Sequence, residues 1–421
     1  MAKKEKVLLV GAYRGRDGRS GAGESLDELA LLARTAGGDV VSRVLQEKRT
    51  IDPATFIGRG KAEEIGELCR EKGVDLVVFD DDLSPAQARN LEELVGVRVI
   101  DRSQLILDIF ALGARTSVAK AQVELAQIEY TLPRLTGMWE HLSRTGGGIG
   151  TRGPGETQLE VDRRRIRRRM FTLKKVLKKV EQDRTVRTSR RKEFLKASLV
   201  GYTNTGKSTL FNLLTRAAVG TGDRLFETLD TTTRILNLPS KEAMLLSDTV
   251  GFIKKLPHHL VVSFHATLEC VIEADLVIHV ADLSHPNYEA QIATVREVLE
   301  EIGAGGKQEM LVFNKVDLTG DEASLNLELR RNEGALAISA LHGWGVEELK
   351  QRLFELASRD KAEVFVVLPQ EDTAGLSYVN RYGRVLGSES RDGTLRLRVR
   401  IDRKYLKPLE AYIESGSKKP S

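Results

Sequence analysis

The sequence predicts an α/β protein built around a doubly wound parallel sheet, and three observations support this fold class. Short apolar runs alternate with amphipathic segments between residues 6 and 110. The alternation resumes from 196 to 358, where several apolar runs resemble strands buried on both faces. Heptad spacing between these two stretches favours long helices. We expect an N-terminal α/β domain (1–112), a basic helical hairpin (113–192), the doubly wound sheet (196–358), a small C-terminal α+β domain (361–415) and a disordered tail (416–421).

The N-terminal region gives strand and helix signals in the order of βαβ units. A helix is expected from Ser84, a capping residue that Pro85 follows. Its other expected helices cover 25–38 and 61–73, and its expected strands cover 7–12, 40–45, 74–82 and 97–101.

Two heptad seams predict an antiparallel hairpin with a glycine-rich tip at 142–157. Pro133 lies within the first seam, where we expect the helix to kink or end. The seams consist of Val118, Ala121, Leu125, Ile128, Leu132 and Leu135, and of Leu159, Ile166, Met170, Leu173, Leu177 and Val180.

Positive charge is concentrated in the second arm of this hairpin. The chain has a formal net charge of +5, yet residues 161–192 hold 15 Lys and Arg against 3 Asp and Glu. Clustered cations favour a polyanion partner such as nucleic acid, because they neutralise phosphates and release counterions. A solvated helix face is the alternative. The RNA-binding candidates are Arg144, Arg152, Arg163, Arg164, Arg167 and Arg168.

Residues 196–358 alternate apolar runs and helical stretches, and the C-terminal region follows with strand signals at 364–369 and 394–402. We expect a final helix over 404–413. The composition, with 41% hydrophobic residues, supports several packed cores. We find no signal peptide and no transmembrane run. The two cysteines, Cys69 and Cys270, exclude a disulfide framework, so we expect a cytosolic protein.

The segment from Gly201 to Ser208 fits the phosphate-binding pattern G-x-x-x-x-G-K-[ST] between an expected strand and an expected helix. Backbone N–H groups of this loop would face phosphate oxygens at the helix N-terminus. Lys207 would reach the β- and γ-phosphates, and the Ser208 hydroxyl would bind Mg²⁺. The loop comprises Gly201, Tyr202, Thr203, Asn204, Thr205, Gly206, Lys207 and Ser208.

Three further motifs follow apolar runs of the same region. Asp248 could hold Mg²⁺ through water, and the Gly251 N–H could contact a γ-phosphate. Asp317 could accept two hydrogen bonds from the N1–H and N2–H₂ groups of guanine, a donor pair that adenine lacks. A backbone N–H in the third motif, residues 339–341, could donate to guanine O6. The motifs are Asp248, Thr249, Val250 and Gly251; Asn314, Lys315, Val316 and Asp317; and Ser339, Ala340 and Leu341.

Together, the motifs GYTNTGKS, DTVG, NKVD and SAL resemble those of translation-factor-type P-loop GTPases. Nearly the whole chain resembles the HflX family of ribosome-associated GTPases. The most specific parts of this resemblance are the tip GGGIGTRGPGE beside the basic heptads and the segment FETLDTTTR. The resemblance implies binding of GTP and GDP, hydrolysis of GTP, binding to the large ribosomal subunit and its rRNA, and splitting or rescue of stalled ribosomes under stress.

The resemblance also implies that the segment closing on the nucleotide consists of Phe226, Glu227, Thr228, Leu229 and Asp230. Thr228 matches the threonine that binds Mg²⁺, although Thr231 and Thr232 are close rivals. Lys207 and Gly251 match catalytic positions.

Two residues bear on the rate of hydrolysis. Phe252 follows the DTVG motif where many GTPases have a glutamine that orients water, so we expect slow intrinsic hydrolysis that ribosomes stimulate. Asn204 could help to hold K⁺ beside the phosphates, as in similar GTPases; an inert, solvent-facing Asn is the alternative.

Other clusters are more simply explained as structural. We expect a tight turn at 57–61, a surface location for His258, His259 and His265, and a solvated loop at 80–82. We expect a monomer. The alternative function is a nucleotide-sensing RNA-binding or ribosome-assembly module with little turnover. A third possibility, an RNA helicase powered by the N-terminal domain, is not supported, because the sequence has no second complete nucleotide-binding motif.

Overall fold

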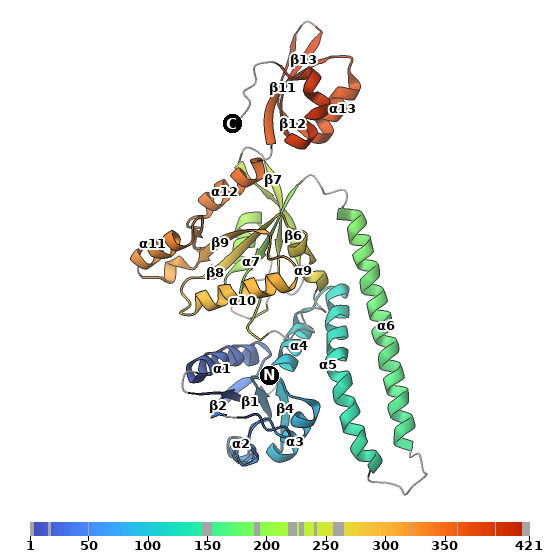
Figure 1. Ribbon diagram of the computed structural model, residues 1–421, viewed down its shortest axis with the longest axis vertical. Helices are drawn as coiled ribbons and strands as arrows, with labels where there is room; N and C mark the ends of the chain where they lie inside the picture. The colour runs from blue at the N-terminus through green and yellow to red at the C-terminus, as the bar shows by residue number, and fades with distance from the viewer. Residues whose placement is uncertain are drawn as a thin grey trace.

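The computed structural model confirms the predicted fold class and arranges the chain as three sheet-containing units with a long helical hairpin along one side (Figure 1). No helix in the described part of the chain has the length and apolar character needed to cross a lipid bilayer. The structure describes residues 4–15, 18–48, 50–144, 154–188, 194–217, 225–226, 231–239, 242–255, 265–320, 322–359, 361–391 and 393–414.

The N-terminal domain has a parallel sheet in the order β2-β1-β3-β4. Helices α1 and α4 contribute to the core on one face of the sheet, and α2 and α3 to the core on the other. A capping box at Ser84 starts α3, as the sequence predicts. The elements are β1 (Lys6–Tyr13), α1 (Gly18–Thr35), β2 (Asp39–Glu47), α2 (Arg59–Lys72), β3 (Leu76–Phe79), α3 (Pro85–Val95), β4 (Arg98–Asp101) and α4 (Arg102–Gly113).

The hairpin consists of α5 (Ser117–Arg144) and α6 (Pro154–Thr188). Residues of both predicted seams form its contact, a cluster of Ala121, Leu125, Ile128, Met170, Leu173 and Leu177. The helix does not end at Pro133, one of the two outcomes expected there, because α5 continues through it. Tyr130 and Arg134, on either side of the proline, both hydrogen-bond to Asp101 of the N-terminal domain and so anchor this part of the helix.

The central domain has six strands in the order β10-β9-β8-β5-β7-β6, with only the edge strand β6 antiparallel to its neighbour. The chain order reverses beside β5, which places the loop after β5 at a topological switch point, where ligands of such sheets bind. The elements are β5 (Leu195–Val200), α7 (Lys207–Thr215), β6 (Thr232–Asn237), β7 (Ala243–Asp248), α9 (His265–Ile272), β8 (Leu276–Asp282), α10 (Tyr288–Glu301), β9 (Gln308–Asn314), η3 (Val316–Leu318), α11 (Glu322–Arg331), β10 (Leu336–Ala337) and α12 (Val346–Ser358).

The C-terminal domain is a three-stranded antiparallel sheet in the order β11-β13-β12 with one helix. The expected final helix is instead a pair of short 3₁₀ segments, the second of which begins at Lys407 with Pro408 in its first turn. The elements are β11 (Lys361–Pro369), α13 (Thr373–Tyr382), β12 (Gly383–Arg391), β13 (Thr394–Asp402), η4 (Arg403–Tyr405) and η5 (Lys407–Tyr412).

Candidate functional site

The phosphate-binding loop joins β5 to α7, whose first residue is Lys207. The Lys207 ammonium donates to the Tyr202 carbonyl at 2.7 Å and is buried. Burial lowers the pKa of Lys207 to about 8, although the nearby Asp248 carboxylate opposes the shift. Anionic phosphates at the α7 N-terminus would favour the charged ammonium.

Two oxygen-bearing side chains meet beside this lysine. Ser208 Oγ donates to Asp248 Oδ2 at 2.8 Å, and Asp248 is fully buried at the end of β7. A hydroxyl and a carboxylate suit Mg²⁺, which takes few protein ligands and completes its shell with water and phosphate oxygens. This pair therefore fits a divalent ion that is bound together with a phosphate ligand.

The segment after β7 lies directly against the phosphate-binding loop. Phe252 N–H donates to the Gly201 carbonyl at 3.0 Å, and its carbonyl accepts from Thr203 N–H at 2.7 Å. A Cβ on Gly251 would lie 2.9 Å from Thr203 Cα, so no larger residue fits there without a shift. The Phe252 side chain is buried in the core between the domains and offers no group to a water molecule.

The predicted guanine-recognition motifs converge at the ends of β9 and β10. Asn314 Nδ2 donates to the Thr205 carbonyl at 2.8 Å, and its Oδ1 accepts from Ala340 N–H at 2.9 Å. Gly206 has a φ of +90°, and a Cβ there would meet Asn314 Nδ2 at 2.2 Å. These contacts join the loop after β5 to the loops that follow β9 and β10.

Lys315 and Asp317, the two charged residues of the NKVD motif, make different contacts. The Lys315 ammonium pairs with Asp282 at 2.7 Å. Asp317 lies 3.7 Å from His342 Nε2, and its side chain is 11% exposed. Leu341 is largely exposed on the loop that follows β10.

The first residue of the segment expected to close on the nucleotide, Phe226, packs against the N-terminal domain. Phe226 is buried with its ring edge-on to Phe110 of α4, 4.7 Å between centroids. Leu225 N–H donates to Thr35 Oγ1 of α1. Glu227, Thr228, Leu229 and Asp230 lie outside the described residues.

Sequence reasoning missed a polar network that joins the loop after β5 to the N-terminal domain. The Tyr202 hydroxyl donates to Glu28 of α1 and accepts from Lys254 N–H at 2.7 Å. Burial and the Glu28 carboxylate raise the Tyr202 pKa, so its proton stays available to donate. Glu28 in turn pairs with Arg102, a fully buried guanidinium at the start of α4.

The same network reaches the segment after Gly251. Arg102 Nη1 lies 2.7 Å from Asp80 Oδ1, and Lys255 Nζ lies 2.6 Å from Asp80 Oδ2 and 2.8 Å from Asp81. The expected solvated loop is therefore wrong for Asp80, which is 3% exposed and ion-paired. We call Tyr202, Glu28, Arg102, Asp80 and Lys255 the interdomain ring. No local pattern could have revealed it, because its members lie on five different segments.

The other predicted clusters have simple structural roles where they are described. Gly58 caps the N-terminus of α2, and Arg59 and Lys61 pair with glutamates of the same helix. His258 and His259 lie outside the described residues, as does the side chain of His265. Asn204 has a φ of 61° and lines a cavity of about 340 Å³ between α1 and the phosphate-binding loop.

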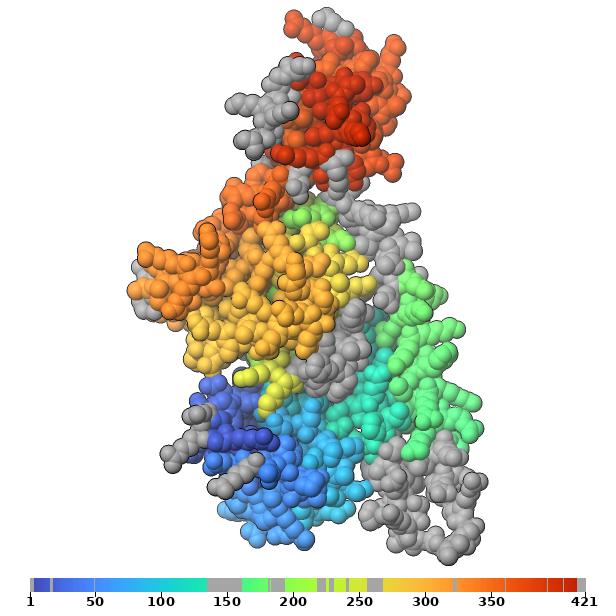
Figure 2. Space-filling view, in the orientation of Figure 1, coloured from blue at the N-terminus to red at the C-terminus, as the bar shows by residue number. Residues whose placement is uncertain are grey.

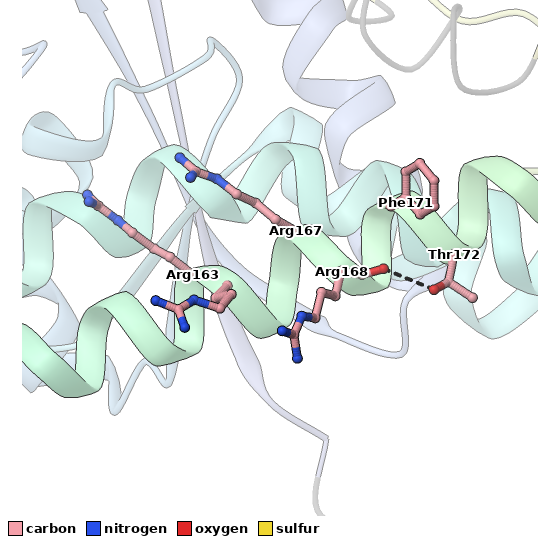
Figure 3. Close-up of a pocket in the computed structure, with 6 residues that line it drawn as sticks. Arg163, Arg167, Arg168, Phe171 and Thr172 are labelled. Atoms are coloured by element: carbon pink, nitrogen blue, oxygen red, sulfur yellow. Dashed lines mark hydrogen bonds between the residues drawn. The ribbon is translucent and has the colours of Figure 1, made fainter.

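The predicted RNA-binding arginines of α6 gather on its outer surface. Figure 2 shows α6, in green, along one long edge of the molecule. A hollow of about 670 Å³ is lined by Arg163, Arg164, Arg167, Arg168, Phe171 and Thr172. Figure 3 shows the labelled arginine side chains and Phe171 projecting from the same stretch of α6, and the Phe171 side chain is 72% exposed. Arg144 has no described side chain, and Arg152 lies outside the described residues.

Comparisons with known proteins match most of the chain to families of GTP-binding proteins. Residues 23–111 match the family described as GTP-binding GTPase N-terminal, residues 113–191 match GTP-binding GTPase Middle Region, and residues 196–315 match 50S ribosome-binding GTPase. A crystal structure of a GTP-binding protein from Sulfolobus solfataricus in complex with GDP is 24% identical, covers 84% of this chain and 99% of its own, and has a TM-score of 0.45.

Relatives named GTPase HflX are much more similar in sequence. That of Alkalihalophilus pseudofirmus is 50% identical over 75% of both chains. That of Escherichia coli is 43% identical over 87% of this chain and 86% of its own. Identity at this level, over most of both chains, shows that the protein belongs to the HflX family of GTPases and hydrolyses GTP.

Proposed function

We propose that this GTPase binds the large ribosomal subunit through α6 and the N-terminal domain, and that it splits or rescues stalled ribosomes under stress in the cytoplasm. The observation that carries the ribosomal part is the arginine surface of α6. None of Arg163, Arg164, Arg167 and Arg168 forms an ion pair with a described carboxylate, whereas Arg169 on the same helix pairs with Glu124. Guanidinium groups that line one hollow with an exposed aromatic ring suit phosphate and base contacts of RNA.

In this proposal, the nucleotide site works with the residues that the sequence indicates. Backbone N–H groups of the loop after β5 bind the phosphates, Lys207 neutralises the β- and γ-phosphates, and Gly251 N–H contacts the γ-phosphate. Ser208 and Thr228 would hold Mg²⁺, and Asp248 would support it through water. The ion would supply positive charge against the negative charge that develops during phosphoryl transfer. Asp317 selects guanine, and the 339–341 loop donates to guanine O6.

The contacts between the domains suggest how nucleotide state reaches the ribosome-binding parts. Leu225 and Phe226 precede the segment expected to close on GTP, and Lys254 and Lys255 follow Gly251; all four contact the N-terminal domain or the interdomain ring. Closure of either segment on a γ-phosphate therefore strains or releases these contacts. Ribosome binding would act on the same contacts and raise hydrolysis, which Phe252 leaves slow.

Co-sedimentation with separated ribosomal subunits tests this function directly. We expect binding to the large subunit with a non-hydrolysable GTP analogue, weaker binding with GDP, and a rise in multiple-turnover phosphate release when large subunits are added. Gln at Arg163, Arg164, Arg167 and Arg168 together should weaken this binding. The matched control is Arg169→Gln, because Arg169 is already paired with Glu124. Equal phosphate release with and without large subunits would reject the ribosome-stimulated mechanism.

A further inference from the structure

Tyr202, in the loop after β5, hydrogen-bonds to three parts of the molecule. Its carbonyl accepts from Lys207 Nζ at 2.7 Å, and its hydroxyl accepts from Lys254 N–H, also at 2.7 Å. The same hydroxyl donates to Glu28 of α1 in the N-terminal domain. Tyr202 is 6% exposed, so water competes little for these bonds. The lysine expected to bind phosphates, the segment after Gly251 and the N-terminal domain therefore meet at one residue.

The N-terminal domain sets the direction of the Tyr202 hydroxyl. A tyrosine hydroxyl has one proton to donate, and a carboxylate can only accept. Because the proton goes to Glu28, a lone pair of the hydroxyl oxygen is left for Lys254 N–H. Arg102 pairs with the same Glu28 carboxylate and holds it beside Tyr202. A contact inside the central domain is thus oriented by side chains of its neighbour.

Gly251 lies between two anchored residues and close to Lys207. Before it, Thr249 Oγ1 donates to a β5 carbonyl at 2.6 Å. After it, Lys254 N–H is bound by the Tyr202 hydroxyl. A Cβ on Gly251 would lie 3.0 Å from Lys207 Nζ, so this arrangement already places the glycine beside the lysine expected to bind the β- and γ-phosphates. Loss of the second anchor would let the Gly251 N–H turn away from that position.

We propose that Tyr202 is a positioning residue for GTP hydrolysis, and that its hydroxyl, oriented by Glu28, holds residues 251–254 so that the Gly251 N–H faces the γ-phosphate. The hydroxyl acts through this segment and not on the reacting atoms. It therefore affects the rate of phosphoryl transfer and leaves the affinity for GDP, which has no γ-phosphate, nearly unchanged. This inference rests on the proposed role of Gly251.

The test compares wild type with Tyr202→Phe, which loses the hydroxyl and keeps the ring and the backbone carbonyl. Single-turnover GTP hydrolysis by the full chain with Mg²⁺ and without ribosomes gives the rate, and calorimetry gives the GDP dissociation constant. We expect hydrolysis to be about tenfold slower, as for the loss of one buried hydrogen bond, and the GDP dissociation constant to change by less than about twofold. Tyr288→Phe is the matched control, because it removes a hydroxyl of the same domain that donates to Glu289 of α10 at 3.4 Å; its rate should equal that of wild type.

Two results would overturn the inference: a wild-type rate in Tyr202→Phe, or a loss of GDP affinity as large as the loss of rate, which would indicate a structural role. Gly251→Ala, measured alongside, distinguishes this failure from failure of the proposed function. If Gly251→Ala hydrolysed GTP at the wild-type rate, the proposed role of Gly251 would fall and the inference with it. If Gly251→Ala were slow and Tyr202→Phe were not, only the role of the hydroxyl would be refuted.

Discussion

Replacing Arg102 by Met removes a cation that two buried carboxylates share. Arg102 is 1% exposed, and the side chains of its partners Asp80 and Glu28 are 3% and 16% exposed. Removing one partner of a buried ion pair costs about 3–5 kcal/mol, because the remaining charge stays desolvated. Lys255 still faces Asp80 and offsets part of this cost. We therefore expect the free energy of unfolding of the N-terminal domain to fall by about 3 kcal/mol at pH 7.

The deficit should depend on pH with a definite sign. Burial acts to raise the pKa of Asp80, but Arg102 and then Lys255 outweigh it and hold that pKa below its usual range. A carboxyl with a lowered folded pKa stabilises above its unfolded pKa, about 3.9, and this stabilisation is lost as the pH falls through the folded pKa. Without Arg102, burial favours the protonated carboxyl. The deficit of Arg102→Met should therefore be smaller at pH 4.5 than at pH 7.

Hydrogen exchange of the β1 and β3 amides measures this opening locally, without requiring the whole chain to unfold in one step. Arg43→Met is the matched control, because Arg43 pairs with Asp27 on the exposed side of α1, where side-chain exposures are 43% and 68%. The control should change protection little. If the amides of Arg102→Met exchanged as slowly as those of wild type at pH 7, the ring would not stabilise this domain.

Three further predictions concern the nucleotide and RNA sites. Asp317→Asn should shift the preference from guanine to xanthine nucleotides by at least tenfold, because an amide donates where the carboxylate accepts; unchanged GDP affinity in calorimetry would contradict this. Gly251→Ala should lower single-turnover phosphate release about tenfold or more, because its Cβ would press on Thr203 Cα at 2.9 Å and Lys207 Nζ at 3.0 Å; a wild-type rate would contradict this steric effect. Gln at Arg163, Arg164, Arg167 and Arg168 should make large-subunit binding less sensitive to salt. The slope of log K against log salt concentration should fall by about 0.7–0.9 for each phosphate that is no longer neutralised, and an unchanged slope would place the RNA elsewhere.

The convergence of the motif residues was predictable because the information that places them is local. The spacing from Gly201 to Ser208 and the positions of Asp248 and Asn314 after apolar runs place these groups at one edge of a parallel sheet, and the structure brings them together. The interdomain ring was not predictable, because Glu28, Arg102 and Lys255 become neighbours only when two domains pack. The solvated loop expected at Asp80 failed for this reason: an acidic run after a strand gives no sign that a distant guanidinium will cover it.

Phe252 contacts both the loop after β5 and the core between the domains. A glutamine at this position could orient water, but the phenylalanine instead fills the core that the central and N-terminal domains share. Its backbone pairs with Gly201 and Thr203, and Lys255, three residues later, is ion-paired to Asp80. Gly251, expected to contact the γ-phosphate, lies between the loop and this anchor. We infer that Gly251 cannot move relative to the phosphates without moving the N-terminal domain, so a partner that shifts this domain also alters the geometry of hydrolysis.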